Sequence, residues 1–165
     1  MAIPLRGWTS CSTYFITASS SDKRLLLQSD RMACLLIDVL YHYREQNRYL
    51  LHEFVVMPNH LHLLITPSQS LERALQLVKG GFSFRAKREL NFADEIWQSS
   101  YYDRRVRDVS EYEKIKNYIR QNPVRARLID NAEDYPYSSA NLKFSLDEAP
   151  QRLKPFEIQL SEPQR

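Results

Sequence analysis

The stretch MPNHLHLLI, residues 57–65, decides how this chain folds, because it joins two apolar runs through a turn. The residues 48–57 before the turn and 60–66 after it are rich in apolar and β-branched side chains, which favour strands. Pro58 and Asn59 between them are typical of a tight turn. The pattern therefore predicts a β-hairpin.

The two histidines of this hairpin are candidate metal ligands. Side chains alternate along a strand, so His60 and His62 are expected on one face, with Leu61 and Leu63 on the other. A buried imidazole must find a polar partner or stay neutral, and two imidazoles side by side can bind one cation. A pair of structural histidines, or an exposed edge strand, explains the same spacing until a third ligand is found.

The rest of the chain predicts the other elements of an α+β fold. Apolar spacing and helix caps predict these elements, in addition to the hairpin: a strand over 11–19, a helix over 29–46, a helix over 70–90, a strand over 103–108 and a helix over 110–122. Ser110 and Glu113 form a capping-box pattern at the start of the last helix. The helix over 70–90 is expected to break or bend at Gly80 and Gly81.

The element order βαββαβ is the ferredoxin-like pattern, an antiparallel sheet with helices on one face, here with one added helix. This last helix can pack across the sheet near the histidines. In it, Tyr112, Ile115 and Ile119 form a packing stripe, Tyr118 lies beside the stripe, and Asn122 follows one turn later. Tyr118 and Asn122 can therefore face one site, although a tyrosine at this spacing is otherwise a core or rim residue.

Length and composition predict one domain. The chain has 165 residues, of which 43% are hydrophobic, enough for one core. We expect a domain over 1–144 and a loosely ordered tail over 145–165, where Pro, Glu and Gln are frequent. The apolar runs are shorter than the roughly 18 residues that a membrane span needs, and the N-terminus lacks a signal-peptide pattern. A cytoplasmic protein is expected.

Basic charge gathers in one part of the chain. Between Arg73 and Arg127 there are 13 Lys and Arg against 7 Asp and Glu, a local charge of +6, which leaves the rest at −3. Aromatic residues are interleaved with these charges. Such a segment suits a nucleic-acid backbone and its bases, and a solvated helix face explains the charge equally well.

Two motifs identify a resemblance. MPNHLHLLI resembles the HUH motif, and YIRQNPVRARL, residues 118–128, resembles the tyrosine motif of single-tyrosine HUH transposases, specifically the REP-associated tyrosine transposases, which are IS200-like. The similarity runs from about Thr13 to Ala140 and includes the stretches WQSSYYDRRVRD and DYPYSSA. HUH alone is a weak signal, whereas HUH followed by this tyrosine motif is specific.

The resemblance implies an HUH endonuclease fold in which His60, His62 and Asn122 bind a divalent metal and Tyr118 is the nucleophile. It implies Mg²⁺ or Mn²⁺, and because imidazole and amide ligands suit a transition metal, Mn²⁺ satisfies both arguments. The implied substrate is single-stranded or hairpin DNA, cleaved through a 5′-phosphotyrosine. A monomer is expected rather than a dimer that exchanges the tyrosine helix, with nucleoid association when DNA is bound.

Two positions depart from the family pattern or from helix preferences. Arg127 stands where the family often has glycine, so a different helix end is expected there. Asn122 precedes Pro123, and a residue before proline disfavours the helical region. Lys114 and Gln121 are candidates to accept the proton of Tyr118.

Ten residues are candidates for DNA contacts: Lys79, Arg85, Lys87, Arg88, Arg104, Arg105 and Arg107 for phosphates, and Phe82, Tyr101 and Tyr102 for stacking. Two other functions fit parts of the pattern: a hairpin-binding protein without chemistry, and a phosphoesterase that uses water. The stretch KGGFSF faintly resembles an RNA-recognition motif, but it continues into RAKREL as a helix, which argues against that fold.

Overall fold

The computed structural model describes residues 12–151 and 153 of the chain. Its main elements are β1 (Thr13–Ser19), α1 (Asp30–Glu45), β2 (Tyr49–Met57), β3 (His60–Pro67), α2 (Leu71–Leu90), β4 (Tyr102–Val106) and α3 (Val109–Arg125). The strands form one antiparallel sheet in the order β2-β3-β1-β4. The predicted α+β, ferredoxin-like fold with an added helix is therefore confirmed.

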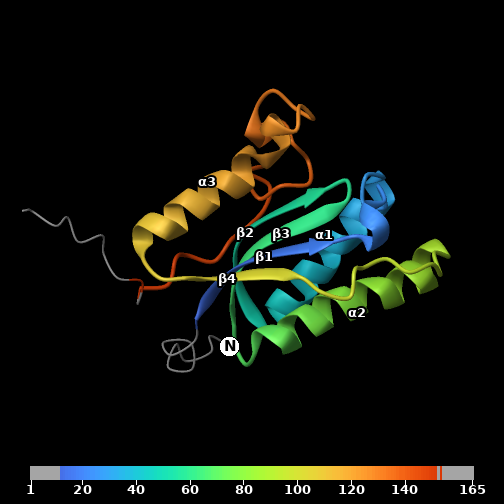
Figure 1. Ribbon diagram of the computed structural model, residues 1–165, viewed down its shortest axis with the longest axis horizontal. Coiled ribbons are helices and arrows are strands. Elements are labelled where there is room, and N and C mark those ends of the chain that lie inside the picture. The colour runs from blue at the N-terminus through green and yellow to red at the C-terminus, as the bar shows by residue number, and fades with distance from the viewer. Residues whose placement is uncertain (1–11, 152, 154–165) are drawn as a thin grey trace, which may run out of the picture.

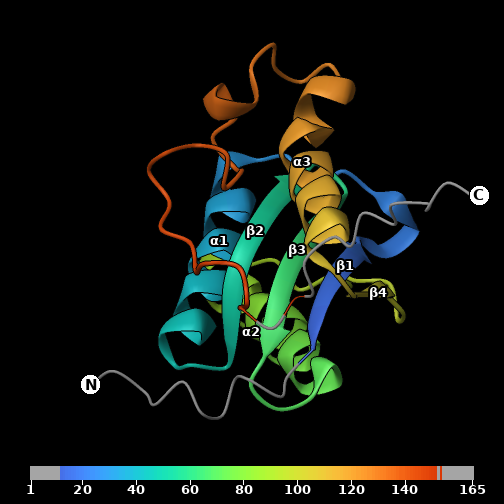
Figure 2. The ribbon, with the colours of Figure 1, turned by 90° about the vertical axis from the view of Figure 1, so that its left-hand side faces the viewer.

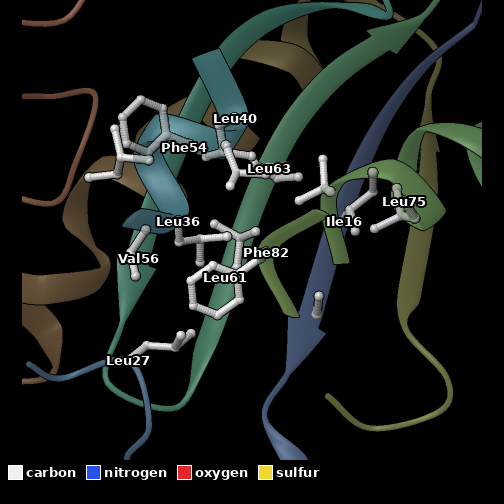
Figure 3. Packing of buried hydrophobic residues seen from close by; sticks show 14 of the residues in the cluster. Ile16, Leu27, Leu36, Leu40, Phe54, Val56, Leu61, Leu63, Leu75 and Phe82 are labelled. Atoms are coloured by element: carbon white, nitrogen blue, oxygen red, sulfur yellow. The ribbon is translucent and has the colours of Figure 1, made fainter. Parts of the chain in front are cut away.

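The larger hydrophobic core lies between the sheet and the layer formed by α1 and α2. Figures 1 and 2 show these two helices on one face of the sheet and α3 on the other. Ile16, Leu61 and Leu63 point from the strands into this core, where Leu36 and Phe82 meet them from the helices (Figure 3). All five side chains are completely buried.

The opposite face of the sheet carries a smaller apolar cluster under α3. Tyr112, Ile115 and Ile119 pack from the helix onto Val55 and Leu64 of β2 and β3. The predicted packing stripe is therefore confirmed, and so is the expectation that the last helix crosses the sheet. Because His60 and His62 alternate with Leu61 and Leu63 along β3, the histidines lie on the α3 face.

The predicted break in α2 at the glycine pair is wrong, because α2 is one continuous helix from Leu71 to Leu90. The reason for a glycine at position 81 is the close approach of α1. A Cβ atom on Gly81 would lie 2.6 Å from the hydroxyl oxygen of Tyr43, whereas one on Gly80 would meet nothing within 4 Å. The stretch KGGFSF lies within this helix, which agrees with the argument against an RNA-recognition fold.

The ends of α3 differ from the prediction at two points. The helix starts at Val109, one residue before Ser110, and its cap is Asp108, whose carboxylate accepts a hydrogen bond from the N–H of Glu111 at 2.8 Å. At the other end the helix continues through Asn122 and Pro123.

Arg127 follows the end of α3 with a φ of 59°, a left-handed conformation that glycine would adopt at lower cost. The N–H of Arg127 donates to Val124 O at 3.0 Å and the N–H of Leu128 donates to Pro123 O at 2.9 Å. This is the Schellman pattern of helix termination. The arginine is therefore accommodated, and the helix ends as it would with glycine.

The segment after Ser145 is attached to the sheet as far as it is described. The N–H of Asp147 donates to Leu51 O at 2.8 Å, beside the edge strand β2, and the Asp147 carboxylate forms an ion pair with Arg44 of α1 at 2.9 Å. These first residues are therefore not loose, contrary to prediction. The rest of the predicted tail, 152 and 154–165, lies outside the described residues. No helix of the described part is long and apolar enough to cross a membrane.

Candidate functional site

The two histidines of β3 converge on one point. Their Nε2 atoms lie 3.1 Å apart, and their ring centroids 4.6 Å apart. Metal–imidazole bonds of about 2.1 Å that meet at about a right angle separate two donor atoms by about 3 Å. The pair therefore has the spacing that two ligands of one divalent ion require.

The other ring nitrogen of each histidine is held by a neighbour. His60 Nδ1 lies 2.7 Å from Asn59 Oδ1, which can only accept, so His60 carries its proton on Nδ1. The lone pair on His60 Nε2 can then accept a hydrogen bond from His62 Nε2 at 3.1 Å or bind a metal. His62 Nδ1 lies 2.8 Å from the hydroxyl oxygen of Thr17, its partner on β1. Because a hydroxyl can donate or accept, Thr17 can support the His62 tautomer with Nε2 free.

Burial keeps both imidazoles neutral. His62 is 4% exposed, and burial, together with the charge of His60, lowers its pKa to about 3. Burial also lowers the pKa of His60, with a smaller contribution from the charge of Lys23. Neutral imidazole is the form that binds metals, so protons do not compete for the pair at neutral pH.

Tyr118 of α3 lies beside the histidine pair, as the packing argument predicts. Its ring centroid is 5.5 Å from that of His62, and its side chain is 38% exposed. Phe15 of β1 contacts both residues. Its ring centroid is 5.9 Å from that of Tyr118, and the ring stacks on His62 with the centroids 5.3 Å apart. The tyrosine is therefore packed on one side and open to solvent on the other.

Asn122 follows Tyr118 by one turn of α3, but the structure gives its side-chain amide no hydrogen-bond partner among the described residues. No third His, Cys, Asp or Glu joins the histidine pair within the same part of the chain. The pair fits a metal in donor chemistry and spacing, and a half-buried amide on the facing helix is compatible with a third ligand. Its role stays a prediction.

The predicted DNA contacts on α2 lie in the layer opposite the histidines. Phe82 is completely buried against Trp97, so it is a core residue and cannot stack on a base, which corrects the prediction. Arg85 is engaged by Asp38 and Glu89. Lys87 and Arg88 are exposed on this helix.

Lys79 and Tyr101 also engage each other on the α2 side. The Lys79 ammonium donates to Gln98 O at 2.8 Å and lies 5.8 Å from the Tyr101 ring centroid. Burial lowers the pKa of this lysine. These two residues therefore already have partners within the domain.

Two of the candidates on β4, Tyr102 and Arg104, lie on the sheet face of the histidines, whereas Arg105 pairs with Tyr14 on the opposite face. Tyr102 pairs with Thr17 across the strands, so it shares the face of His62, and it is 55% exposed. Arg104 pairs with Phe15 on the same face and forms an ion pair with Glu111 of α3 at 2.6 Å. An open cleft of about 530 Å³ lies between β4 and the start of α3, and it is lined mainly by Arg104, Arg105, Arg107, Asp108, Glu111 and Lys114.

Sequence patterns did not reveal a buried ion pair beside this site. Glu53 of β2 is completely buried, and its carboxylate pairs with Arg120 of α3 and accepts a hydrogen bond from the Ser139 hydroxyl at 2.6 Å. Arg120 and Tyr118 flank Ile119 on opposite sides of the helix. Thr17 was missed as well, because only strand pairing brings it to His62. Asn59 adjoins His60 in the sequence, so its contact could have been proposed.

Comparisons with known proteins agree with this architecture. Residues 9–122 match the family model of IS200-like transposases. An uncharacterized protein of Haemophilus influenzae is 29% identical over 96 residues, which make up 44% of this chain and 53% of that protein. A REP-associated tyrosine transposase of Escherichia coli is 22% identical over 142 residues, covering 81% of this chain and 79% of that one.

A similar fold occurs in a solved structure of a REP-associated tyrosine transposase bound to a REP hairpin. The two chains superpose with a TM-score of 0.66 at 20% identity, over 93% of this chain and 94% of the other. At this identity the likeness concerns the fold.

Proposed function

The chain belongs to the family of IS200-like transposases, and on that premise we propose that it cleaves and rejoins single-stranded DNA near hairpins through a covalent bond to Tyr118. The observation that carries this proposal is the contact of Tyr118 with His62, whose ring centroids lie 5.5 Å apart. The family supplies the class of enzyme, a transposase. The residues supply the chemistry proposed for it.

We propose Mg²⁺ or Mn²⁺ as the cofactor, held by His60, His62 and Asn122. The 3.1 Å separation of the two Nε2 atoms supports one shared ion. When bound, the ion supplies Lewis-acid stabilisation for the scissile phosphate and for the departing 3′ oxygen. Asn59 holds Nδ1 of His60 and Thr17 holds Nδ1 of His62, so both rings turn their Nε2 atoms toward the proposed metal position.

Tyr118 is the nucleophile of the proposed reaction. Its hydroxyl oxygen attacks the phosphorus in line, the bond from phosphorus to the 3′ oxygen breaks, and the 3′ oxygen takes a proton from water and leaves as a hydroxyl. The phenol proton passes to water, because the side chain is 38% exposed and makes no hydrogen bond with Lys114 or Gln121 among the described residues. The tyrosyl ester retains the phosphodiester bond energy, so the 3′-hydroxyl of another strand can reverse the step.

The substrate strand lies along β4 in this proposal. Exposed Tyr102 shares a sheet face with His62, and the arginine-lined cleft continues from Arg104 toward the start of α3. An aromatic ring and guanidinium groups are the side chains that stack on bases and bind phosphates. The structural relative bound to a REP hairpin supports a hairpin as the ligand. Lys87 and Arg88 remain candidates for contacts away from the site.

We also propose that one chain completes the site. Tyr118 already contacts His62 of its own chain, so no exchange of α3 with a second copy is needed. This supports a working monomer.

The test is covalent capture of DNA. Labelled single-stranded hairpins from the sequence flanking the gene are incubated with protein and Mn²⁺ and run on a denaturing gel. We expect an adduct with the wild type and none with Tyr118→Phe or His60→Ala. Tyr14→Phe removes a hydroxyl on the opposite sheet face and serves as the matched control, which retains the adduct.

Two results would contradict the proposal. Binding without an adduct, across several flanking hairpins and both metals, would indicate a hairpin-binding protein without chemistry. Cleavage that survives Tyr118→Phe would identify water as the nucleophile.

A further inference from the structure

Arg125, the last residue of α3, lies against the candidate nucleophile. Its guanidinium carbon is 4.4 Å from the centroid of the Tyr118 ring, and its Nη2 donates a hydrogen bond to the backbone carbonyl oxygen of Tyr118 at 3.4 Å. Two helical turns separate the residues along α3, so the side chain runs back along the helix to reach the ring. A permanent positive charge is thereby held against the tyrosine ring.

No acidic side chain neutralises this charge within the described residues. Four other arginines of the described part do have such partners: Arg44 pairs with Asp147, Arg85 with Asp38 and Glu89, Arg104 with Glu111, and Arg120 with Glu53. Arg125 is exposed, and it lies against the residue whose ring contacts His62, because the ring centroids of Tyr118 and His62 are 5.5 Å apart. Its one hydrogen bond to the protein leaves its other N–H groups available for a ligand.

An arginine near a helix C-terminus commonly stabilises the last carbonyl groups and nothing else. Two features of Arg125 exceed that role. The carbonyl that it reaches belongs to Tyr118 itself, and the guanidinium lies over the ring of that residue. Contact between a cation and a ring face is weak at an exposed site, so the side chain can leave the ring when an anion arrives.

We infer that Arg125 is a catalytic residue that binds the non-bridging oxygens of the phosphate as it transfers to Tyr118. This inference rests on the function proposed above and names a group of the same site. The planar guanidinium can donate two parallel N–H bonds to a phosphate, which lysine cannot do. The charge opposes the negative charge that builds up as the bond from the tyrosine oxygen to phosphorus forms and the bond to the 3′ oxygen breaks.

The test is the single-turnover rate of adduct formation at saturating hairpin DNA with Mn²⁺. Arg125→Gln is expected to slow this rate about 100-fold, the usual loss when one donor to a transition state is removed. Arg125→Lys keeps the charge without the paired donors, so its rate of adduct formation is expected to lie between those of the wild type and Arg125→Gln. Arg31→Gln removes the same charge from an exposed position on α1 and serves as the matched control.

Chemical rescue separates phosphate binding from a structural role. Added guanidinium ion is expected to accelerate adduct formation by Arg125→Ala, because it replaces the missing hydrogen-bond donors. Sodium chloride at the same ionic strength is expected to have no such effect. A merely structural role would give no selective rescue. Melting temperatures of all variants show whether the fold is intact.

The possible failures are distinguishable. If the wild type forms adduct and Arg125→Gln reacts as fast as Arg31→Gln, the role of Arg125 is overturned while the proposed function stands. Slow Arg125→Ala without guanidinium rescue would also overturn phosphate binding. A wild type without any adduct would overturn the proposed function, and the role of Arg125 with it.

Discussion

At the scale of single residues, the site depends on which ring nitrogen of each histidine stays free. Asn59 fixes the proton of His60 on Nδ1, so Nε2 of that ring is available without rearrangement. His62 depends on the Thr17 hydroxyl, which must accept from Nδ1 when Nε2 binds a metal. The two neighbours therefore determine how well the histidine pair can bind an ion.

Thr17→Val is expected to weaken Mn²⁺ binding about 10- to 100-fold, because losing such a supporting partner leaves the ligand ring unoriented. Titration of Mn²⁺ followed by electron paramagnetic resonance measures the affinity without DNA or catalysis. Val has the shape of Thr, so the strand is preserved and an unchanged melting temperature serves as the control. Equal affinity in the variant and the wild type would show that Thr17 does not orient His62.

At the scale of elements, α3 is fixed to the sheet at two separate strands. Glu111 in its first turn pairs with Arg104 of β4, and Arg120 pairs with Glu53 of β2. Since Arg120 and Tyr118 flank Ile119, the second ion pair opposes rotation of the helix that would carry the tyrosine away from His62.

Arg120→Met is expected to lower the free energy of unfolding by about 2 kcal/mol, because it leaves the buried Glu53 without its cation. Removing one partner from a fully buried pair costs more, but the Arg120 side chain is 38% exposed. Urea denaturation measures the change. Lys114→Met, an exposed position on the same helix, is the control and should change little; an equal loss there would assign the effect to the helix surface rather than to the ion pair.

The edge strand β4 carries Tyr102, an exposed aromatic residue on the sheet face of His62. Tyr102→Leu is expected to weaken binding of a single-stranded oligonucleotide by about 1–3 kcal/mol, the contribution of one stacked base. Tyr102→Phe should bind like the wild type. Fluorescence anisotropy measures both, with Phe84→Leu, an exposed aromatic on α2, as the control. Equal weakening by the two leucine variants would contradict a path along β4.

At the scale of the whole molecule, the C-terminal region closes the edge of the sheet. Residues near Ser138 pair with β2, and Asp147 links Arg44 of α1 to the backbone N–H of Leu51. Burial alone would raise the pKa of Asp147, but the hydrogen bonds from Arg44 and Leu51 lower it below its ordinary value. The folded protein therefore favours the ionised carboxylate.

Asp147→Asn is expected to cost about 1 kcal/mol of stability at pH 7, the net value of a typical hydrogen bond. Because the folded state lowers this pKa, the contribution is complete above the pKa of the unfolded chain, about 4, and is lost as pH falls through the folded value. Urea midpoints between pH 2 and 7 should therefore converge for variant and wild type in acid. A constant difference at all pH values would contradict this, and Asp94→Asn is the exposed control.

The sequence alone determined the hairpin, the face shared by His60 and His62, and the packing stripe of α3, because these follow from local periods of two residues in strands and 3.6 in helices. It also carried the two motifs of the family. Local patterns were weaker where a neighbour decides the outcome: the pair Gly80 and Gly81 predicts a break or bend, but the close approach of Tyr43 explains Gly81 within a continuous helix.

Only the tertiary structure decided which basic and aromatic residues lie near the site. The basic and aromatic segment of the sequence groups Lys79, Phe82 and Arg85 with the residues of β4. In the fold, however, these three residues lie on α2, in the helix layer on the other side of the sheet from the histidines, and Phe82 is buried in the core. The contacts of Thr17 with His62, Glu53 with Arg120 and Arg125 with Tyr118 likewise depend on strand register and on where α3 crosses the sheet. Periodicity specifies which way a side chain points from its own element, whereas packing between elements determines what it meets there.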